Sequence, residues 1–228
     1  MFRIFFDDNY KRKKLYKSTR STVMKEFYKK PFPNKKEFIS DIDIIALDFE
    51  TTGLDINDSD IVSIGLVKIS QLGINLESCT HQLINTKSEL SESSVVIHQI
   101  TDTKSASGTN IETAIPNLLE TLSGNVMLAH NAKVELGFIN KMCQKLYGTD
   151  FVIPVIDTQY LAKRSLERKN QTYKPNELRL FNLRKSLNMP AYKAHNALMD
   201  AIATAELFLA MVNRISPKSN GRLSDFLS

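Results

Sequence analysis

The 228-residue sequence has only two cysteines and no long apolar run. Cys79 and Cys143 are 64 positions apart, a separation that fits neither a dense disulfide framework nor a metal-ligand motif. We therefore expect reduced core thiols in a cytoplasmic protein. No apolar stretch approaches the roughly 18 residues of a membrane span, so we expect no membrane partner.

The sequence also lacks internal repeats, low-complexity tracts and a recognisable secretory signal. Met1 to Phe6 are mostly apolar, but Asp7 and Asp8 interrupt them and no small-residue cleavage site follows. Hydrophobic residues make up 42% of the chain, which is enough to bury one full core at this length. We expect one domain with an appendage.

Positive charge is concentrated in residues 1–40. This stretch holds 12 lysines and arginines against four aspartates and glutamates, whereas residues 41–228 hold 18 against 21. It also holds nine of the 19 phenylalanines and tyrosines, and disordered tails are usually poor in aromatics. We expect it to be partly helical and to pack on the body or on a partner. Interleaved basic and aromatic residues suit single-stranded nucleic acid, and a solvated basic face is the alternative.

Two carboxylates follow an apolar strand in the segment Asp43–Leu54. Ile44 to Leu47 are apolar on both faces, as in a central strand. Asp48 and Glu50, at i and i+2, then share one face with Cα atoms roughly 6.5 Å apart. A bound cation would relieve their repulsion. The alternative is a strand end that reaches solvent, with Thr51 and the next two residues forming a turn.

The rest of the chain predicts a mixed α/β sheet flanked by helices. Apolar segments 61–69 and 74–84 continue the first strand as an antiparallel three-stranded meander. Shorter strands at 126–129 and 152–156 then alternate with helices, which favours parallel pairing. The expected helices are 111–122, one from Asn131 as N-cap to Tyr147, 158–168, 179–187 and 194–215.

Three further residues have polar side chains that their expected positions in these elements do not explain. Asp200 lies among small and apolar residues on the last helix and needs a partner. His195, near the start of that helix, suits a general base, and a capping or buried histidine is the alternative. With Asn131 as N-cap, the capping-box position is Val134, so Glu135 falls one residue too late. Glu135 is then a ligand or a complement to the helix dipole.

Three ordered segments resemble the motifs of the DEDDh 3′-to-5′ exonucleases, a family that includes the proofreading epsilon subunit of DNA polymerase III, RNase T and oligoribonuclease. They are residues 48–54, 130–135 and 195–200, and residues 96–101 are similar to a further family segment. The resemblance covers about residues 42 to 212. It implies a ribonuclease H-like fold and metal-dependent release of nucleoside monophosphates from single-stranded or frayed DNA.

The resemblance also implies roles for individual residues. Asp48 would bridge two divalent cations, Mg²⁺ or Mn²⁺, with Glu50 and Asp200 completing the first site and Glu135 supporting the second. His195 would deprotonate the attacking water. Hard divalent cations prefer carboxylate ligands, which agrees with this assignment. The terminal nucleotide would be held by Thr51, Thr52 and Leu54, with His98 nearby.

Glu135 and Val134 depart from the family pattern, which usually has an aspartate and an aromatic residue there. The extra methylene moves the carboxylate by about 1.5 Å, so activity is retained, tuned to Mn²⁺ or weakened. An RNA or oligoribonucleotide substrate and a catalytically weak nucleic-acid-binding module are the alternatives. A replication or repair partner is left open. We expect a basic extension (1–40), an exonuclease domain (41–215) and a fraying C-terminal tail (216–228).

Overall fold

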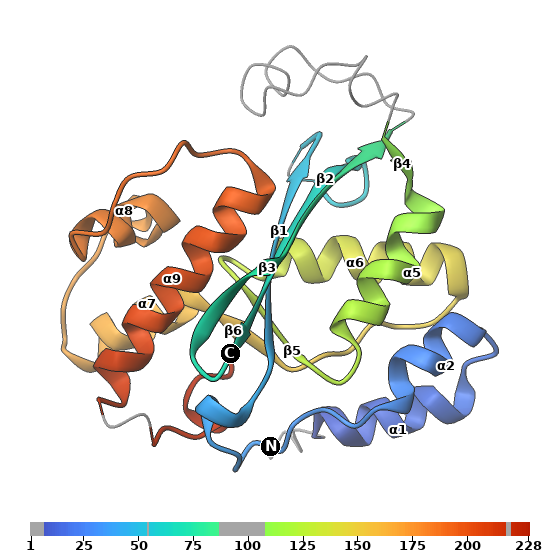
Figure 1. Ribbon diagram of the computed structural model, residues 1–228, viewed down its shortest axis with the longest axis horizontal. Helices are drawn as coiled ribbons and strands as arrows, with labels where there is room; N and C mark the ends of the chain where they lie inside the picture. The colour runs from blue at the N-terminus through green and yellow to red at the C-terminus, as the bar shows by residue number, and fades with distance from the viewer. Residues whose placement is uncertain (1–6, 54, 87–107, 218–219) are drawn as a thin grey trace.

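The computed structural model describes residues 7–53, 55–86, 108–217 and 220–228. Within these residues a six-stranded sheet in the order β4-β3-β2-β1-β5-β6 lies between two groups of helices (Figure 1). β1 (Ile44–Thr51), β2 (Ile61–Ser70) and β3 (Gly73–Asn85) pair antiparallel in sequence order. The predicted meander is therefore confirmed.

The other strands pair in parallel. β5 (Val126–Ala129) lies beside β1, and β6 (Val155–Asp157) lies beside β5. β4 (Thr109–Asn110) pairs with β3 at the opposite edge. β6 begins three residues later than expected, because the Val152 amide donates to the Tyr28 hydroxyl (2.9 Å) and Pro154 has no amide hydrogen. The mixed sheet expected from the sequence is confirmed.

Helices cover both faces of the sheet (Figure 1). α5 (Ile111–Leu122) and α6 (Lys133–Tyr147) pack on one face, and α9 (Ala197–Ile215) packs on the other with α7 (Thr158–Arg168) and α8 (Leu180–Ser186) beside it. Short 3₁₀ turns occur at Ile39–Asp41, Pro175–Leu178 and Leu223–Asp225. Among the helices described, none combines the length and apolar character that crossing a bilayer requires.

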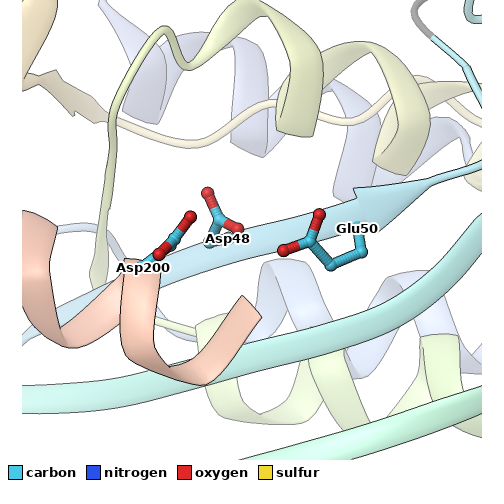
Figure 2. Close-up of side chains that lie close together, drawn as sticks. All are labelled: Asp48, Glu50 and Asp200. Carbon is cyan, nitrogen blue, oxygen red and sulfur yellow. The ribbon is translucent and has the colours of Figure 1, made fainter. Parts of the chain in front are cut away.

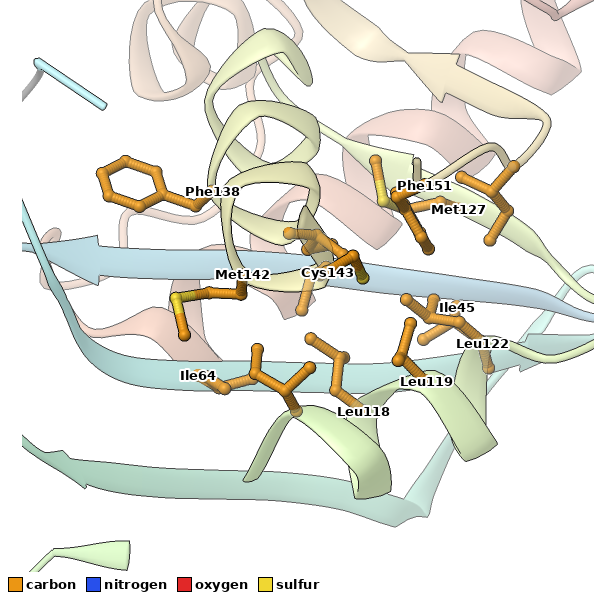
Figure 3. Packing of buried hydrophobic residues seen from close by; sticks show 14 of the residues in the cluster. Ile45, Ile64, Leu118, Leu119, Leu122, Met127, Phe138, Met142, Cys143 and Phe151 are labelled. Atoms are coloured by element: carbon orange, nitrogen blue, oxygen red, sulfur yellow. The ribbon is translucent and has the colours of Figure 1, made fainter. Parts of the chain in front are cut away.

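β1 contributes to a separate core on each face. Ile45 (Figure 3) and Leu47 pack with α5 and α6, whereas Ile44 and Ala46 pack with α9, and all four are at most 2% exposed. Burying each large side chain contributes about 1.5–3 kcal/mol. Cys143 lies in the first core and Cys79 is half-buried against the second, and neither is in a disulfide. The central position expected for this strand is confirmed.

The N-terminal segment forms two helices that pack on the body. They are α1 (Asp8–Ser18) and α2 (Thr22–Lys29). Phe27 stacks on Phe151 with ring centroids 5.3 Å apart, and the Tyr28 hydroxyl donates to the Asp150 carbonyl at 2.6 Å. The expected helical content and packing are confirmed. The residues of this segment in the α5–α6 core are Met24, Phe27, Tyr28 and Phe32.

The C-terminal residues 220–228 are held against the α9 side of the molecule. Leu223 and Phe226 are both 0% exposed, and the Phe226 ring meets Phe208 of α9 edge-on at 5.8 Å. The Arg222 guanidinium lies over the Phe38 ring at 5.3 Å. The prediction that this end frays is wrong, because its apolar side chains complete the core beside α9.

Candidate metal centre

Asp48 and Glu50 project from the same face of β1 (Figure 2). Asp48 is paired with Gly65 of β2 and Glu50 with Ser63. Asp200, in the first turn of α9, reaches the same space from across that face (Figure 2). The period of two expected from the sequence therefore places two acids on one strand face, and α9 adds a third.

The three carboxylates form a compact cluster. One ligand oxygen from each of Asp48, Glu50 and Asp200 lies within 4.8 Å of the other two. Glu50 is 5% exposed and Asp200 is 9% exposed. Burial, together with the charges of Glu135, Asp200 and Glu50, holds the pKa of Asp48 well above its usual range. Asp48 itself is half-buried. An oxygen-rich cluster of this kind fits a divalent cation. Because Glu50 is buried, the alternative in which both acids of the strand reach solvent is wrong.

Gly65 allows α9 to approach the sheet closely enough for this geometry. A Cβ atom at Gly65 would lie 2.1 Å from the carbonyl carbon of Ala197 and 2.2 Å from the amide nitrogen of Leu198. The side chain of Asn196 caps the helix by accepting the Met199 amide at 3.1 Å. The start of α9 thus rests directly on β2, with Asp200 one turn along. An isolated glycine within a strand pattern is the sequence signal for such a contact.

His195 precedes α9 at the rim of the acidic cluster. The helix begins at Ala197, so the start expected at Ala194 is wrong by three residues. His195 has a left-handed backbone with φ 68°, and its amide donates to Asp200 Oδ2 at 3.2 Å. Its side chain is exposed. The backbone of His195 and the carboxylate of Asp200 are therefore directly coupled.

Arg184 anchors the segment that leads to His195. It is 1% exposed and donates to the carbonyls of Ala203 (2.9 Å) and Pro190 (3.1 Å). It also pairs with Glu206 at 2.8 Å and lies 4.6 Å from the ring of Tyr192, whose hydroxyl donates to Glu206 at 2.8 Å. These contacts tie α8, the following segment and α9 together. Sequence reasoning missed Arg184, because nothing in the local pattern distinguishes a buried arginine.

Glu135 lies in the first turn of α6 and is 3% exposed. Asn131 is not the N-cap as predicted: it is left-handed with φ 65°, and Ala132 is the N-cap. Glu135 therefore takes the capping-box position that the sequence reasoning gave to Val134. Burial raises the pKa of Glu135 to about 8. A hydrogen bond from the backbone amide of Glu135 opposes this shift, and the charge of Asp157 adds to it. Its effect on Asp48 places Glu135 beside the cluster, although it is not among the three mutually close ligands.

Asp157, at the end of β6, caps two helices at once. Its carboxylate accepts the amides of Asn131 (3.0 Å) and Ala132 (3.1 Å) before α6, and those of Gln159 (2.8 Å) and Tyr160 (3.3 Å) in α7. The Ala132 amide is the group that a capping-box glutamate would accept. Since Asp157 accepts it, Glu135 is not needed for capping. Sequence reasoning missed Asp157, although an aspartate directly before a helix is a known N-cap signal.

The residues expected at the terminal nucleotide are only partly described. The Thr51 hydroxyl donates to the Gly53 carbonyl at 2.8 Å. Thr52 and Asp60 exchange two bonds of 2.9 Å, one between backbone groups and one from the Asp60 amide to the Thr52 hydroxyl. Both threonines thus close the turn after β1. Leu54 and His98 lie outside the described residues.

His81 of β3 shares a cross-strand row with Asp48. Gly65 pairs with both residues, so the two side chains point to the same face, and the backbone of Ala197 and Leu198 lies over Gly65 between them. Partial burial lowers the pKa of His81, and the charge of Glu50 opposes this shift. His81 is exposed and lies across the start of α9 from Asp48, within electrostatic range of Glu50. Sequence reasoning missed it, because a single histidine in a strand belongs to no motif.

Comparison with known families accounts for this geometry. The family model for RNase T, described as Exonuclease, matches residues 45–208. The chain belongs to this exonuclease family. The match includes the four acids Asp48, Glu50, Glu135 and Asp200. The DEDDh-type resemblance and the ribonuclease H-like fold expected from the sequence are both confirmed.

Relatives and solved structures agree with this assignment. The chain is 33% identical over 185 residues to DNA polymerase III PolC-type of Thermotoga maritima, covering 81% of this chain and 13% of that protein. It is 24% identical over 171 residues to the epsilon subunit of DNA polymerase III of Aquifex aeolicus, covering 75% of this chain and 81% of the subunit. The chain thus spans only about an eighth of the PolC-type relatives.

Two solved structures share the fold. The nuclease domain of 3′hExo, a DEDDh family member bound to rAMP, has a TM-score of 0.65 at 15% identity, covering 78% of this chain and 95% of that one. Exonuclease X in complex with 5′-overhanging duplex DNA has a TM-score of 0.60 at 23% identity, covering 80% and 98%.

Proposed function

We propose that this protein is a 3′-to-5′ exonuclease that hydrolyses terminal phosphodiesters of single-stranded or frayed DNA. The observation that carries the proposal is the cluster of Asp48, Glu50 and Asp200, with ligand oxygens within 4.8 Å of one another. DNA is favoured because the relatives are named DNA polymerase III and Exonuclease X is in complex with DNA. The same names favour a replication or repair protein as a partner.

The proposed cofactors are two divalent cations, Mg²⁺ or Mn²⁺. Asp48, Glu50 and Asp200 would hold one cation, and Asp48 and Glu135 would hold the other. When bound, the cations polarise the phosphodiester and make the attacking water more acidic. The donor set supports this, because it consists of carboxylates alone and the Oε2 atom of Glu135 has no hydrogen-bond partner among the described residues.

His195 is the proposed general base. Its imidazole would take one proton from the water that attacks the terminal phosphorus, and the bond from phosphorus to the 3′ oxygen of the preceding nucleotide would break. That oxygen leaves with a proton from solvent, and a nucleoside 5′-monophosphate is released. The exposed position of His195 favours return of its proton to solvent. The hydrogen bond from its backbone amide to Asp200 orients the backbone.

The terminal nucleotide would bind over the turn after β1. The backbone around Thr51 and Thr52 is the proposed contact, because the bonds to Gly53 and Asp60 hold it in one conformation. Leu54 and His98 remain proposed contacts on the basis of the family resemblance.

A strand labelled at its 5′ end tests the reaction and its direction together. With Mg²⁺ or Mn²⁺ we expect a ladder of progressively shorter labelled products, and with EDTA none. Asp48→Asn and Asp200→Asn should reduce the rate below detection, whereas Glu77→Gln, at an exposed acid on β3, should not change it. Release of the label as a mononucleotide would show the opposite direction, and an inactive wild type with both metals would refute the proposal.

Matched RNA and duplex DNA distinguish the remaining substrates. A faster rate on RNA of the same sequence would establish the ribonuclease alternative, which is favoured by the rAMP-bound neighbour. For the second cation, Glu135→Gln should slow hydrolysis and Glu135→Asp should retain it. Equal rates for wild type and Glu135→Gln would remove this residue from the site.

A further inference from the structure

The outer face of α1 combines positive charge with an exposed aromatic ring. Tyr10, Lys13, Lys14 and Lys17 occur at i, i+3, i+4 and i+7, so they lie on one side of the helix. Tyr10 is 56% exposed, and the three lysines are exposed. The opposite side carries buried Arg12 and faces the protein. Tyr10 therefore stands within a cluster of three lysines that point to solvent.

The surrounding surface strengthens this positive field. Residues 7–36 present ten exposed cations and only three acids, Asp7, Asp8 and Glu26. The ion pairs described here join Lys35 to both aspartates and Lys29 to Glu26. Among the described residues, no ion pair joins the other cations to an acid, and Lys11 acts on Asp8 only through a longer-range electrostatic interaction. The ten are Lys11, Lys13, Lys14, Lys17, Arg20, Lys25, Lys29, Lys30, Lys35 and Lys36.

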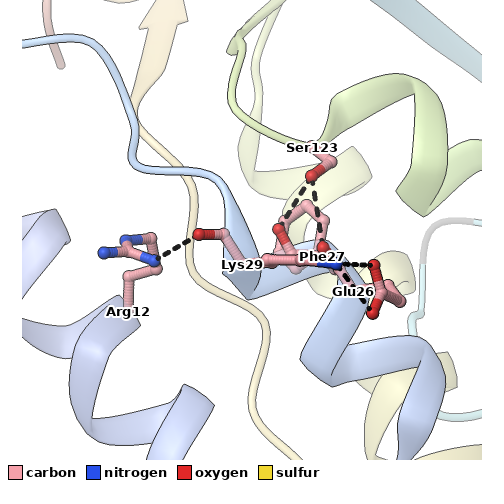
Figure 4. Close-up of polar contacts among 5 residues, drawn as sticks. All are labelled: Arg12, Glu26, Phe27, Lys29 and Ser123. Atoms are coloured by element: carbon pink, nitrogen blue, oxygen red, sulfur yellow. Dashed lines mark hydrogen bonds and ion pairs between the residues drawn. The ribbon is translucent and has the colours of Figure 1, made fainter.

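Hydrogen bonds hold this surface against the rest of the protein, so it is not a flexible tail (Figure 4). The Arg12 guanidinium, 7% exposed, donates to the Tyr28 and Lys29 carbonyls and so joins α1 to the end of α2. The Ser123 hydroxyl, just beyond α5, donates to the Phe27 carbonyl at 2.9 Å. A fixed array of lysines loses less conformational entropy on binding than a flexible tail would.

The two helices lie away from the acidic cluster. A Cβ atom at Gly124, just before β5, would lie 3.0 Å from the Cβ of Lys30, which places the end of α2 near the start of β5. β5 pairs with the first residues of β1, whereas Asp48 and Glu50 are in its second half. Figure 1 likewise shows α1 and α2 beyond the beginning of β1. The match to the exonuclease family starts at residue 45 and does not include them.

We propose that the outer face of α1 binds the sugar-phosphate backbone of the strand whose 3′ end is being hydrolysed, several nucleotides upstream of that end. This rests on the proposed function. Lys13, Lys14 and Lys17 would contact phosphates, and Tyr10 would stack on a base, the combination that binds single strands without sequence preference. The surface would hold long substrates while their ends are hydrolysed at the cluster.

Substrate length separates this surface from the catalytic site. A dinucleotide has a single phosphodiester, the one that is cleaved, so it has no phosphate left for α1. The test variant is Lys13→Gln/Lys14→Gln/Lys17→Gln in the full chain. The matched control is Lys169→Gln/Lys174→Gln/Lys185→Gln, which removes three exposed lysines elsewhere. The measurements are the affinity for a 30-nucleotide DNA strand in EDTA across a salt series, and kcat/KM for that strand and the dinucleotide.

We expect the α1 variant to bind the long strand about tenfold more weakly at low salt, with a log–log salt slope smaller by about two, since each single-strand phosphate contact contributes about 0.7. Dinucleotide hydrolysis should be unchanged, and the control should match wild type. Tyr10→Ala should weaken binding about fivefold without changing the slope.

Equal affinity and slope in the α1 variant and the control would overturn the proposal. An acidic protein would then be the favoured partner of this surface. Equal losses on the dinucleotide and the long strand would also overturn it, because they would indicate a general distortion. If the wild type hydrolyses neither substrate, the proposed function fails, whereas the affinity measurement in EDTA still decides the role of α1.

Discussion

Gly65 of β2 and Ala197 of α9 are in backbone contact, so a single methyl group on Gly65 would lie 2.1 Å from the Ala197 carbonyl carbon. Gly65→Ala should therefore displace the first turn of α9 and separate Asp200 from Asp48. We expect a loss of activity and of Mn²⁺ affinity, measured by hydrolysis and calorimetry. Gly73→Ala is the control, because a Cβ atom there would lie 3.5 Å from the Ser70 carbonyl oxygen, an ordinary van der Waals contact. Retained Mn²⁺ affinity in Gly65→Ala would contradict this prediction.

Asp157 should act on the site through Glu135. Asp157→Asn removes one acceptor oxygen from the four amides that converge there. We expect activity to fall about 10–100-fold, as when outer partners of metal ligands are lost. Combining it with Glu135→Gln should give a rate no lower than that of the slower single variant. Additive losses in this cycle would show that Asp157 acts only through overall stability.

The contribution of Glu135 to the stability of the metal-free protein should fall as the pH rises from about 5 to 8. The pKa of Glu135 is raised to about 8 in the folded state. The folded state therefore holds a proton on Glu135 that the unfolded chain has released, and this one group lowers the unfolding free energy by at most about 1.4 kcal/mol per pH unit. Thermal unfolding in EDTA checks this. Glu135→Gln should flatten the profile, and a profile in Glu135→Gln as steep as that of wild type would assign the effect to another group.

Arg184→Met should destabilise the fold and slow the reaction. The substitution removes a buried cation from Glu206 and from two carbonyl groups, at a cost of about 3 kcal/mol. Because these contacts hold the segment before His195, kcat should fall even at temperatures where the variant is fully folded. Arg179→Met, at an exposed neighbouring position, should change stability by no more than about 0.5 kcal/mol. A variant with unchanged kcat would show that the His195 segment does not need this anchor.

The strands and the acidic pair could be predicted because both follow local rules. Apolar residues on both faces of Ile44–Leu47 identify a central strand, and a period of two places Asp48 and Glu50 together. Local rules indicated Asp200 only through its unfavourable position on an apolar helix, and the family resemblance assigned it to the same site. Its approach depends on Gly65, whose role requires knowledge of which backbone lies above it.

The start of α6 could not be placed from local preference alone, whereas α5 and α7 begin where expected. Asn131 is a favourable N-cap by residue type, but it adopts a left-handed conformation, which asparagine tolerates, and leaves capping to Asp157. Asp157 is 26 positions away from Asn131, and parallel pairing of β5 and β6 brings them together. The burial of Phe226 was missed for a similar reason. The local sequence does not show that Phe208 of α9 packs against its ring.

The packing of α2 also affects how the protein behaves when shortened. Met24, Phe27, Tyr28 and Phe32 belong to the same core as α5 and α6. A version that began where the family match begins, at residue 45, would expose the apolar surface that these side chains cover. Such a protein should self-associate and lose solubility, because a newly exposed apolar patch favours aggregation. We therefore expect α1 and α2 to have two roles. They carry positive charge, and they cover an apolar surface that would otherwise cause aggregation.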